Sequence, residues 1–413
     1  MTIQVLQVAH DHPAFACGGT EFLAHDLTAA LNAVPGVRAR FLAATTSLQR
    51  PDDVPGALGV MGDDHLLRTG RYDRFSMLRQ DGVDWIDSMG RLLGAFRPDI
   101  VHLHGLDRIG AEVLAVLRRK VPQARIVLTL HDYQILCPND GLMLTVPDGA
   151  LCRTAGPDRC HACFPAMPVS AHLLRKSHLT ALLSLVDRFV APSRFLAERF
   201  AEWGIEAERI TVLPNEVRAL GTVARRPRTR PDRFAFFGNI APHKGILPLL
   251  AAVRLAGDSV TLDLHGGLGH AADGFRGAFA KALAAAPNAR HHGPYRREDL
   301  PALMARADWM VMPSIWWENA PLVLLEARAA GLPVICSGIG GMAETVVHGV
   351  TGRTVAPGDP EALAQAMCAA AGDPAGHARM SAALHARRRD DAYSGFVDAH
   401  LALYRTLLER VSA

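Results

Sequence analysis

The 413-residue sequence has no long hydrophobic run and no large excess of charge of either sign. No segment approaches the 18 consecutive apolar residues that a membrane-spanning helix requires. Residues 1–6 carry no basic segment of the kind that opens a signal peptide, and they enter a strand pattern instead. We therefore expect neither a membrane span nor a secretory leader, and we expect a cytoplasmic protein.

The net charge of +3 is too small to indicate nucleic-acid binding, and no basic stripe is interleaved with aromatic residues. Arginines gather in residues 225–233 and 387–389, and basic residues also mark a helical pattern over residues 169–186. These segments are typical of solvated surfaces. The alternative is attraction to an anionic membrane, which would place the protein peripherally at the inner face of the membrane.

What the sequence does contain is a regular alternation of short apolar segments with segments that have the three-and-four spacing of amphipathic helices. The first set of expected strands covers residues 3–9, 37–44, 99–104, 125–131, 188–192 and 210–213. The second set covers residues 234–238, 260–265, 289–293, 309–312, 333–337 and 352–355. This alternation predicts α/β structure, with parallel sheets that carry helices on both faces.

Residues 218–230 separate the two sets of strands. They are poor in large apolar side chains and rich in Arg, Pro and Thr, which is typical of a linker. We therefore predict two tandem Rossmann-like, doubly wound domains, residues 1–217 and 231–392, and a C-terminal helix within residues 393–413 that packs on either domain. Because such sheets bind ligands beyond the carboxyl ends of their strands, we expect an interdomain cleft.

The segment 313–326 joins an expected buried strand to an expected helix and carries two carboxylates. Pro321 suits the first helical position, and Gly331 suits the residue just past the end. On a helix, Glu318 and Glu326 would lie about 12 Å apart along the axis, which is too far for an acid and a base at one bond. They suit two hydroxyl-binding groups on an extended ligand, with free N–H groups between them for an anion.

Two other expected strand-to-helix turns carry groups that suit an anion. Gly18 and Gly19 follow the first strand and let the backbone approach a ligand closely, although a tight turn explains them equally well. Lys244 follows the first strand of the second domain, where it either holds a phosphate or lies on the surface. Neither turn matches a dinucleotide fingerprint or a Walker loop.

The order of these motifs resembles the family 4 glycosyltransferases of the GT-B fold, over nearly the whole chain. The matching motifs are Gly18-Gly19, His131-Asp132, Ala191-Pro192-Ser193, Gly238 to Gly245, Pro313-Ser314 with Glu318 and Glu326, Gly340-Gly341 with Glu344, and Gly349 to Gly352. The two glutamates separated by seven residues are the most specific element.

The resemblance implies a retaining transfer of a sugar from a nucleotide-diphosphate sugar to a hydroxyl of a glycan or glycolipid acceptor, as in polysaccharide or cell-envelope biosynthesis. It implies no catalytic metal. Glu326 would hold the ribose hydroxyls of the donor, Glu318 would contact the transferred sugar, and Lys244 would neutralise the diphosphate leaving group. Backbone N–H groups near Ala320 to Leu322 would assist Lys244, and the segment Asn319, Ala320, Pro321 and Leu322 would line the donor.

The same resemblance assigns roles to residues outside this segment. Gly18 and Gly19 would let the first domain close on the phosphates, His131 would lie beside the sugar, and Tyr295 would contact the nucleotide base. Asn239 departs from the family, which commonly has an arginine there. Because a neutral amide cannot replace a guanidinium, either Arg296, Arg297 or another residue supplies the charge, or activity is reduced. An epimerase and a non-catalytic nucleotide-sugar-binding subunit are the alternative functions.

Four of the seven cysteines cluster in one predicted insertion, residues 137–163. They are Cys137, Cys152, Cys160 and Cys163. The close pair Cys160 and Cys163, with two thiols from a loop rich in Pro, Asn, Asp and Gly, predicts structural zinc, since such a loop has little core of its own. Free thiols, an oxidised pair and an iron–sulfur cluster are the alternatives.

Overall fold

The structure, a computed structural model, describes residues 2–15, 18–46, 56–80, 84–218, 228–269, 271–387 and 392–409. The chain forms two compact units. Unit 1 comprises Met1–Asn215 with Ser394–Ala413, and unit 2 comprises Glu216–Tyr393. Most of the expected linker, residues 219–227, lies outside the described residues. Within the described residues, none of the helices combines the length and apolar character needed to cross a membrane.

Unit 1 is built on an eight-stranded sheet with the order β10-β9-β8-β7-β1-β2-β4-β3. All neighbouring strands pair in parallel except β3 with β4. The strands are β1 (Ile3–Ala9), β2 (Val37–Thr45), β3 (Leu58–Met61), β4 (Asp64–Arg68), β7 (Ile100–His104), β8 (Arg125–Thr129), β9 (Arg188–Ala191) and β10 (Ile210–Val212). A separate two-stranded hairpin joins β5 (Tyr72–Asp73) to β6 (Leu78–Arg79).

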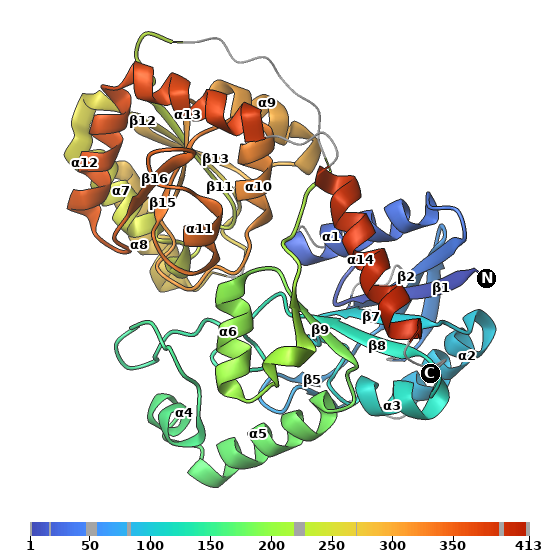
Figure 1. The fold of residues 1–413 in the computed structure, drawn as a ribbon. Coiled ribbons are helices and arrows are strands. Elements are labelled where there is room, and N and C mark those ends of the chain that lie inside the picture. Colours follow the sequence, from blue (N-terminus) through green and yellow to red (C-terminus); the bar gives the residue numbers. More distant parts are fainter. Residues whose placement is uncertain are drawn as a thin grey trace. The chain divides into compact units, whose positions relative to one another are not determined.

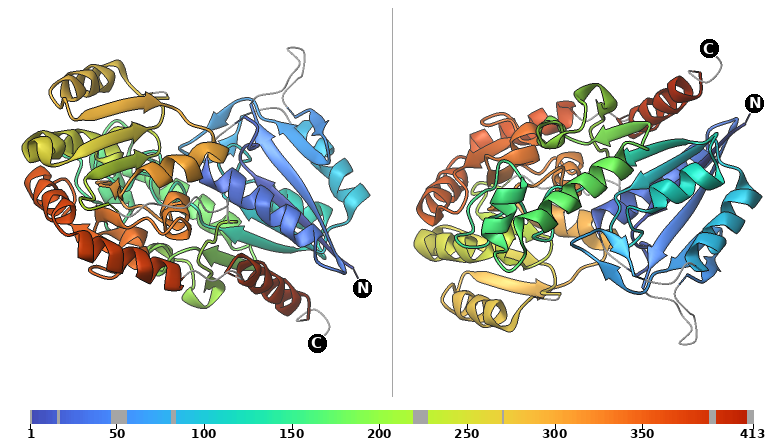
Figure 2. Two further views of the ribbon diagram at one scale, coloured as in Figure 1. Left: turned by 90° about the horizontal axis from the view of Figure 1, so that it is seen from above. Right: turned by 90° about the horizontal axis from the view of Figure 1, so that it is seen from below.

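Helices cover both faces of this sheet (Figure 2). They are α1 (Gly19–Asn32), α2 (Asp84–Phe96), α3 (Val113–Lys120), α4 (Pro157–Cys163), α5 (Val169–Leu183), α6 (Arg194–Trp203) and the C-terminal α14 (Ala392–Glu409), with a short 3₁₀ turn at Ala207–Arg209. The buried face of α14 has helical three-and-four spacing and comprises Phe396, Val397, His400, Leu401, Tyr404 and Leu407. The last helix of the chain therefore belongs to unit 1 (Figure 1).

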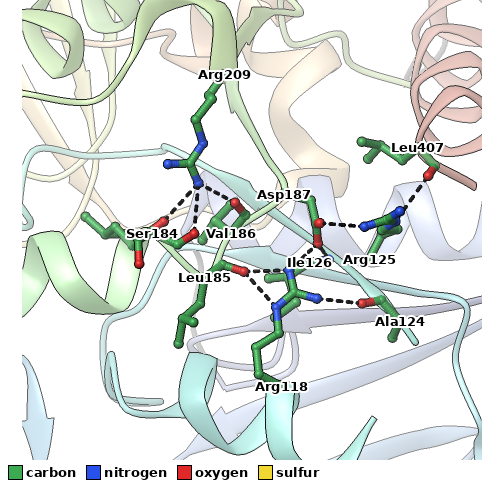
Figure 3. A network of polar contacts seen from close by, with 11 residues as sticks. Arg118, Ala124, Arg125, Ile126, Ser184, Leu185, Val186, Asp187, Arg209 and Leu407 are labelled. Carbon is green, nitrogen blue, oxygen red and sulfur yellow. Dashed lines mark hydrogen bonds and ion pairs between the residues drawn. The ribbon is translucent and has the colours of Figure 1, made fainter. Parts of the chain in front are cut away.

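A network of arginines fastens α14 to the edge of this sheet (Figure 3). Arg125 at the start of β8 donates to the carbonyl of Leu407 at 3.2 Å and to Asp187 at 3.0 Å. Asp187 also accepts from the backbone N–H of Ile126 at 2.7 Å and pairs with Arg118 of α3. Because Leu407 lies in the last turn of α14, the guanidinium satisfies a carbonyl at the negative end of that helix.

Unit 2 has a six-stranded parallel sheet with the order β13-β12-β11-β14-β15-β16. Its strands are β11 (Arg233–Phe237), β12 (Thr261–His265), β13 (Ala289–Gly293), β14 (Trp309–Met312), β15 (Val334–Ser337) and β16 (Gly352–Val355). Its helices are α7 (Ile246–Ala256), α8 (Asp273–Ala284), α9 (Leu300–Arg306), α10 (Leu322–Ala329), α11 (Gly340–Thr345), α12 (Pro360–Ala371) and α13 (Pro374–Arg387), with 3₁₀ turns at Pro242–Lys244, Gly257–Ser259 and Arg297–Asp299.

Strand β14 shows that both faces of this sheet are covered by apolar side chains. Trp309 and Val311 point into one apolar cluster, and Met310 and Met312 point into another on the opposite face. A strand buried on both faces reads as a continuous apolar run, which is the pattern that the sequence displays. The expected parallel α/β architecture is therefore confirmed.

All twelve strands expected from the sequence are present, within a residue or two at most ends. The sequence does not predict the four strands between Leu58 and Arg79, because they are only two to five residues long. Helix α10 begins at Leu322, and Pro321 caps it in an extended conformation instead of opening it. The expected separation of about 12 Å between Glu318 and Glu326 assumed that both residues lie on the helix. That assumption is wrong, because Glu318 precedes α10.

Candidate functional site

In unit 2 the turns that follow the neighbouring strands β11 and β14 are in direct backbone contact. Gly245, at φ 70°, follows the 3₁₀ turn after β11, and a Cβ atom there would lie 2.0 Å from the carbonyl oxygen of Pro313 after β14. The backbone N–H of Ile315 donates to the carbonyl of His243 at 2.9 Å. Glycine is required at position 245 because the two backbones touch.

This contact brings Lys244 and Glu318 together. Lys244 Nζ lies 2.6 Å from Glu318 Oε1, and the same oxygen accepts a hydrogen bond of 2.7 Å from the hydroxyl of Ser314. Glu318 is 4% exposed. The two residues that the resemblance assigns to a phosphate and to a sugar therefore form a buried ion pair.

Electrostatics keep Glu318 ionised. Burial alone would raise the pKa of its carboxyl, but the charge and hydrogen bond of Lys244 and the hydrogen bond of Ser314 outweigh burial and lower it. Burial and the Lys244 charge lower the pKa of the neighbouring His243 to about 4. The site therefore presents one cation and one anion beside a neutral imidazole at neutral pH.

Glu326 lies on α10, one helix turn from its start, and faces Arg297 across 3.6 Å. A pocket beside them is lined by Glu326, Ala329 and Ala330 of α10, by Leu300, Pro301 and Met304 of α9, and by Val217 and Arg218. Arg297 is 16% exposed at its side chain, whereas Arg296 is 80% exposed and pairs with Glu298. Of the two arginines considered as substitutes for the residue missing at Asn239, Arg297 is the one beside a site glutamate.

Asn239 and Tyr295 lie nearby in the same unit. Asn239 is exposed just after β11. Tyr295 follows β13 and packs edge-on against Phe237, with ring centroids 5.9 Å apart. Packing against this core cluster accounts for the aromatic character of residue 295, and its expected contact with a base stays a prediction.

Gly340 and Gly341 hold the loop that precedes α10. The backbone N–H of Gly341 donates to the carbonyl of Glu318 at 2.8 Å, and a Cβ atom at 341 would lie only 1.3 Å from the carbonyl oxygen of Asn319. The glycine pair thus permits the closest backbone approach in this site. It fixes the path of residues 318–321, which lead to the expected anion-binding N–H groups near Ala320 and Leu322.

In unit 1, His131 and Gly18 lie at the carboxyl ends of strands β8 and β1. His131 Nε2 is 3.0 Å from Nδ1 of His104 at the end of β7. Gly18 caps α1, and the carboxylate of Glu21 covers it closely enough that a Cβ atom would collide with Glu21 Oε2 at 2.2 Å. The expected phosphate-binding start of α1 therefore holds a carboxylate of the chain itself.

Glu21 is paired with His10, which directly follows β1, at 3.1 Å. Burial opposes the charged imidazole, but the hydrogen bond and charge of Glu21, aided by Asp107 and Asp132, raise the pKa of His10 to about 9. Burial, reinforced by the charge of His10, instead lowers the pKa of His131 to about 3. One histidine at this edge is therefore charged at neutral pH and the other is neutral.

The cysteine insertion packs around α4 and α5. Burial raises the pKa of Cys137 to about 11, and Cys152 and Cys160 lie close enough to add to this effect. The side chain of Arg175 anchors the segment by donating to the carbonyls of Phe75, Gln134 and Ile135. Cys137, Cys152, Cys160 and Cys163, all among the described residues, do not bring three sulfur atoms within 4.8 Å of one another.

A different set of donor atoms does meet that distance, within the part of the chain that the structure describes. His12 and His25 both contact Asp64 Oδ2 at 3.0 Å. The N–H of Ala14 donates to Nδ1 of His12 at 3.1 Å, which leaves the proton of the neutral ring on Nε2, facing Asp64. Hydrogen bonding to a shared carboxylate therefore accounts for this cluster.

Sequence reasoning did not assign roles to Ser314, His10 or Glu21, which complete the two strand-end clusters. The sequence does contain an indication of the role of Glu21. An acidic residue in the first turn of a helix, beside a glycine, is favoured by the positive end of that helix. The sequence contains no such indication for Ser314, since a serine in a turn is common.

Each unit is a largely parallel α/β domain, and in the second the Lys244–Glu318 pair follows two neighbouring strands. This two-domain architecture is that of the GT-B glycosyltransferases. Residues 17–218 match the family model described as Glycosyltransferase Family 4, and residues 231–373 match that described as Glycosyl transferases group 1. Together the two matches cover most of the chain, which is therefore a glycosyltransferase with one domain of each kind.

Relatives and solved structures agree with this assignment. The chain is 28% identical to a protein named glycogen synthase from Mycobacterium tuberculosis, over 94% of the chain and 91% of that protein. It is 26% identical to a D-inositol 3-phosphate glycosyltransferase of Salinispora tropica, over 84% and 68%. Sucrose-phosphate synthase from Thermosynechococcus elongatus has the same fold, with a TM-score of 0.72, 19% identity and coverage of 99% and 100%.

A further solved structure of the same fold is Anabaena HepE in complex with UDP and glucose. It aligns with a TM-score of 0.68 and 17% identity, and the alignment covers 100% of both chains.

Proposed function

We propose that this glycosyltransferase moves a sugar from a nucleoside diphosphate sugar to a hydroxyl group of a glycan or glycolipid, with retention of the anomeric configuration. The observation that carries the proposal is the 2.6 Å contact between Lys244 and Glu318, three residues before the cap of α10. One cation, one anion and the N–H groups of a helix start are the groups that a diphosphate and a sugar require.

In this proposal Lys244 and the start of α10 stabilise the charge that develops on the diphosphate leaving group. Glu318, held by Ser314, accepts hydrogen bonds from hydroxyls of the transferred sugar. Glu326 accepts from the ribose, and Arg297 beside it supplies the positive charge that Asn239 lacks. When a donor binds, its diphosphate competes with Glu318 for Lys244, so the ion pair opens as the ligand arrives.

Unit 1 supplies His131, Gly18 and Gly19 to the same reaction. Because His131 is neutral at physiological pH, it acts as a hydrogen-bonding group toward the sugar and not as a fixed cation. Gly18 lies against Glu21, so phosphate contact at the start of α1 requires that this carboxylate and its partner His10 rearrange.

Donor and acceptor can be tested together. HepE binds UDP and glucose, and a relative is named glycogen synthase, so we expect a UDP-sugar donor and a glucan acceptor. Labelled UDP-, GDP- and ADP-sugars are incubated with and without a soluble glucan, and the product anomer is read by NMR. Transfer with retention, only when acceptor is present, is expected. Failure of every donor to transfer or to stabilise the protein would overturn the proposal.

The matched variants are Glu326→Gln and Glu361→Gln. Glu326 faces the pocket of α10, whereas Glu361 is exposed on α12 of the same unit. Loss of one charged hydrogen bond to the ribose is expected to weaken donor binding by about tenfold to a hundredfold. Glu361→Gln is expected to bind as the wild type does, in the same calorimetric titration.

We also propose that Cys137, Cys152, Cys160 and Cys163 hold a structural zinc ion. Two features support this: all four cysteines lie in one insertion, and α4, which carries two of them, buries none of its residues. Metal would supply the order that such a segment lacks. Elemental analysis of freshly purified, reduced protein should find zinc, and the variant Cys160→Ser with Cys163→Ser should lose it.

A further inference from the structure

We propose that Gln7, His104 and Tyr404 position His131 through a continuous chain of buried hydrogen bonds that fixes its tautomer. This inference rests on the role that the proposed function gives to His131. None of the three is assigned a contact with substrate, so each is a positioning residue that acts through the next member of the chain.

The fold places these side chains on one face of the unit 1 sheet. Strand β7 lies between β1 and β8, and the parallel register pairs Gln7 with His102 and His104 with Thr129. Since paired residues of adjacent strands point to the same side, all four side chains share a face. Helix α14 covers that face with Tyr404 and His400. The polar side chains enclosed there are 0 to 2% exposed: Gln7, His102, His104, Thr129, His400 and Tyr404.

Distances link five of these groups to the strand-end histidine without a break. Nε2 of His131 lies 3.0 Å from Nδ1 of His104, and Nε2 of His104 lies 2.7 Å from the amide oxygen of Gln7. The amide nitrogen of Gln7 donates to the hydroxyl of Tyr404 at 3.1 Å. That hydroxyl is 2.6 Å from Nδ1 of His102, whose Nε2 is 2.6 Å from the hydroxyl of Thr129.

The amide of Gln7 sets the direction of every bond in the chain. Its oxygen can only accept, so His104 carries its proton on Nε2 and offers the lone pair of Nδ1. His131 must then donate from its own Nε2, which leaves Nδ1 as the acceptor atom of its neutral ring. On the other side, Tyr404 accepts from Gln7 and donates to His102, which donates to Thr129. With the Gln7 amide in this orientation, every member has one assignment, and all assignments agree.

The hydrogen-bond chain requires that the imidazole rings of His102 and His104 be neutral. Burial of this face of the sheet keeps them neutral. Burial lowers the pKa of His102 and of His104 well below the ordinary value, and the neighbouring histidines lower both further. Burial raises the pKa of Tyr404, so its hydroxyl keeps its proton. A fully satisfied polar network of this kind gives a core one defined arrangement, whereas a partly satisfied one is costly.

Helix α14 is thereby part of the support for a residue at the far end of the sheet. Tyr404 enters the chain in the middle of the helix, and one turn later Arg125 binds the carbonyl of Leu407 (Figure 3). These two contacts fix the position of α14 along its own axis. The Tyr404 hydroxyl is therefore held within hydrogen-bond distance of the Gln7 amide.

The test measures the tautomer directly, in the full-length protein without ligand. Histidine ring nitrogens are labelled with ¹⁵N, and long-range ¹⁵N–¹H correlation spectra are recorded, with His131 assigned by a His131→Gln variant. Wild type should show His131 protonated on Nε2. Gln7→Met keeps the side-chain volume but removes both bonds, and it should give a mixture of tautomers. Tyr404→Phe should shift the ring-nitrogen signals of His102. The control Tyr393→Phe changes a residue of the same helix outside the hydrogen-bond chain, and it should leave the signals of both His131 and His102 unchanged.

Transfer assays supply the second readout. Gln7→Met should lower kcat about tenfold while changing the KM for donor less, as expected for a residue that orients another, and Tyr393→Phe should leave both unchanged. The inference is overturned if His131 carries its proton on Nδ1 in wild type, or if Gln7→Met leaves the tautomer or kcat as in wild type. If no donor supports transfer, the proposed function fails, while the tautomer spectra still decide whether the chain exists.

Discussion

The charge of Glu318 depends on its neighbour Lys244. Glu318 is almost completely buried, and Lys244 and Ser314 bond the same carboxylate oxygen. Removing one partner of a buried ion pair typically costs 3 to 5 kcal/mol, because the other charge is left without compensation. The pair should therefore matter both for folding and for the charge that meets the donor.

Lys244→Met tests this pair. We expect the variant to be destabilised by about 3 kcal/mol, and transfer to fall at least about thirtyfold through loss of roughly 2 kcal/mol of transition-state stabilisation. Denaturant unfolding and steady-state kinetics measure the two effects. Lys281→Met, which removes an exposed lysine of α8, is the control and should change neither. Wild-type turnover in Lys244→Met would contradict the assigned role.

The pair of His10 and Glu21 predicts a pH dependence of stability. Because the pKa of His10 in the fold is about 9, above its ordinary 6.5, the charged pair stabilises the fold fully below pH 6.5. That stabilisation is lost as the pH rises toward 9. The pKa of Glu21 is lowered, so its contribution persists until the pH falls below about 4.5.

Thermal unfolding of wild type and Glu21→Gln between pH 6 and pH 9.5 measures this pair. The difference in Tm should be largest near pH 6 and should shrink toward pH 9.5, as His10 loses its proton in the wild type. Glu361→Gln, on the exposed face of α12, should follow the wild-type curve. A Tm difference that stays constant across the range would show that the pair is not the cause.

At the scale of elements, the turns and not the helices or strands decide the geometry of the site. Gly341 and Gly245 each allow one backbone segment to touch another, and both contacts are made by carbonyl oxygens that cannot move independently of their loops. A side chain at either position would displace the loop that carries Glu318 or the turn that carries Lys244.

Gly341→Ala should therefore destabilise unit 2 by more than about 2 kcal/mol, since the new Cβ atom collides with the backbone of Asn319. Gly277→Ala is the opposite case. Gly277 is exposed in the middle of α8, with open space around it, so alanine should stabilise by about 0.5 to 1 kcal/mol. Denaturant unfolding of both variants provides the comparison. A neutral effect of Gly341→Ala would mean that the loop before α10 can move aside.

At the scale of the whole molecule, the chain leaves unit 1 after residue 215, builds unit 2, and returns to unit 1 with α14. The buried face of α14 is apolar except for His400 and Tyr404. Unit 1 therefore depends on the last segment of the chain, whereas unit 2 is continuous in sequence.

Truncation after Arg387 should loosen unit 1 alone. Without α14, the apolar and polar side chains of β1, β7 and β8 lose their cover, so their amide hydrogens should exchange faster by at least tenfold. Strands β11, β12 and β14 of unit 2 should exchange as in the full chain. Mass-spectrometric hydrogen exchange resolves these segments. Equal loosening of both units, or of neither, would contradict the dependence.

The sequence predicted the twelve main strands because most of them are short apolar segments that alternate with helical patterns. It also indicated the family, because glycines, a lysine and two glutamates recur at fixed offsets from those strands. It did not predict β3 to β6, which are only two to five residues long. It left open which unit the last helix joins, since the buried face of α14 is apolar enough for either sheet.

The amino-acid order by itself determined the class of fold, since strand and helix periodicity are local properties of the chain. Only the tertiary structure decided which side chains meet. Lys244 and Glu318 are 74 positions apart, and Gln7 and Tyr404 are 397 apart. Contacts of such separation depend on strand order and register, which no local pattern specifies. The same reason explains why Glu21 covers Gly18, why Arg297 faces Glu326, and why the tautomer of His131 is traced to the C-terminal helix.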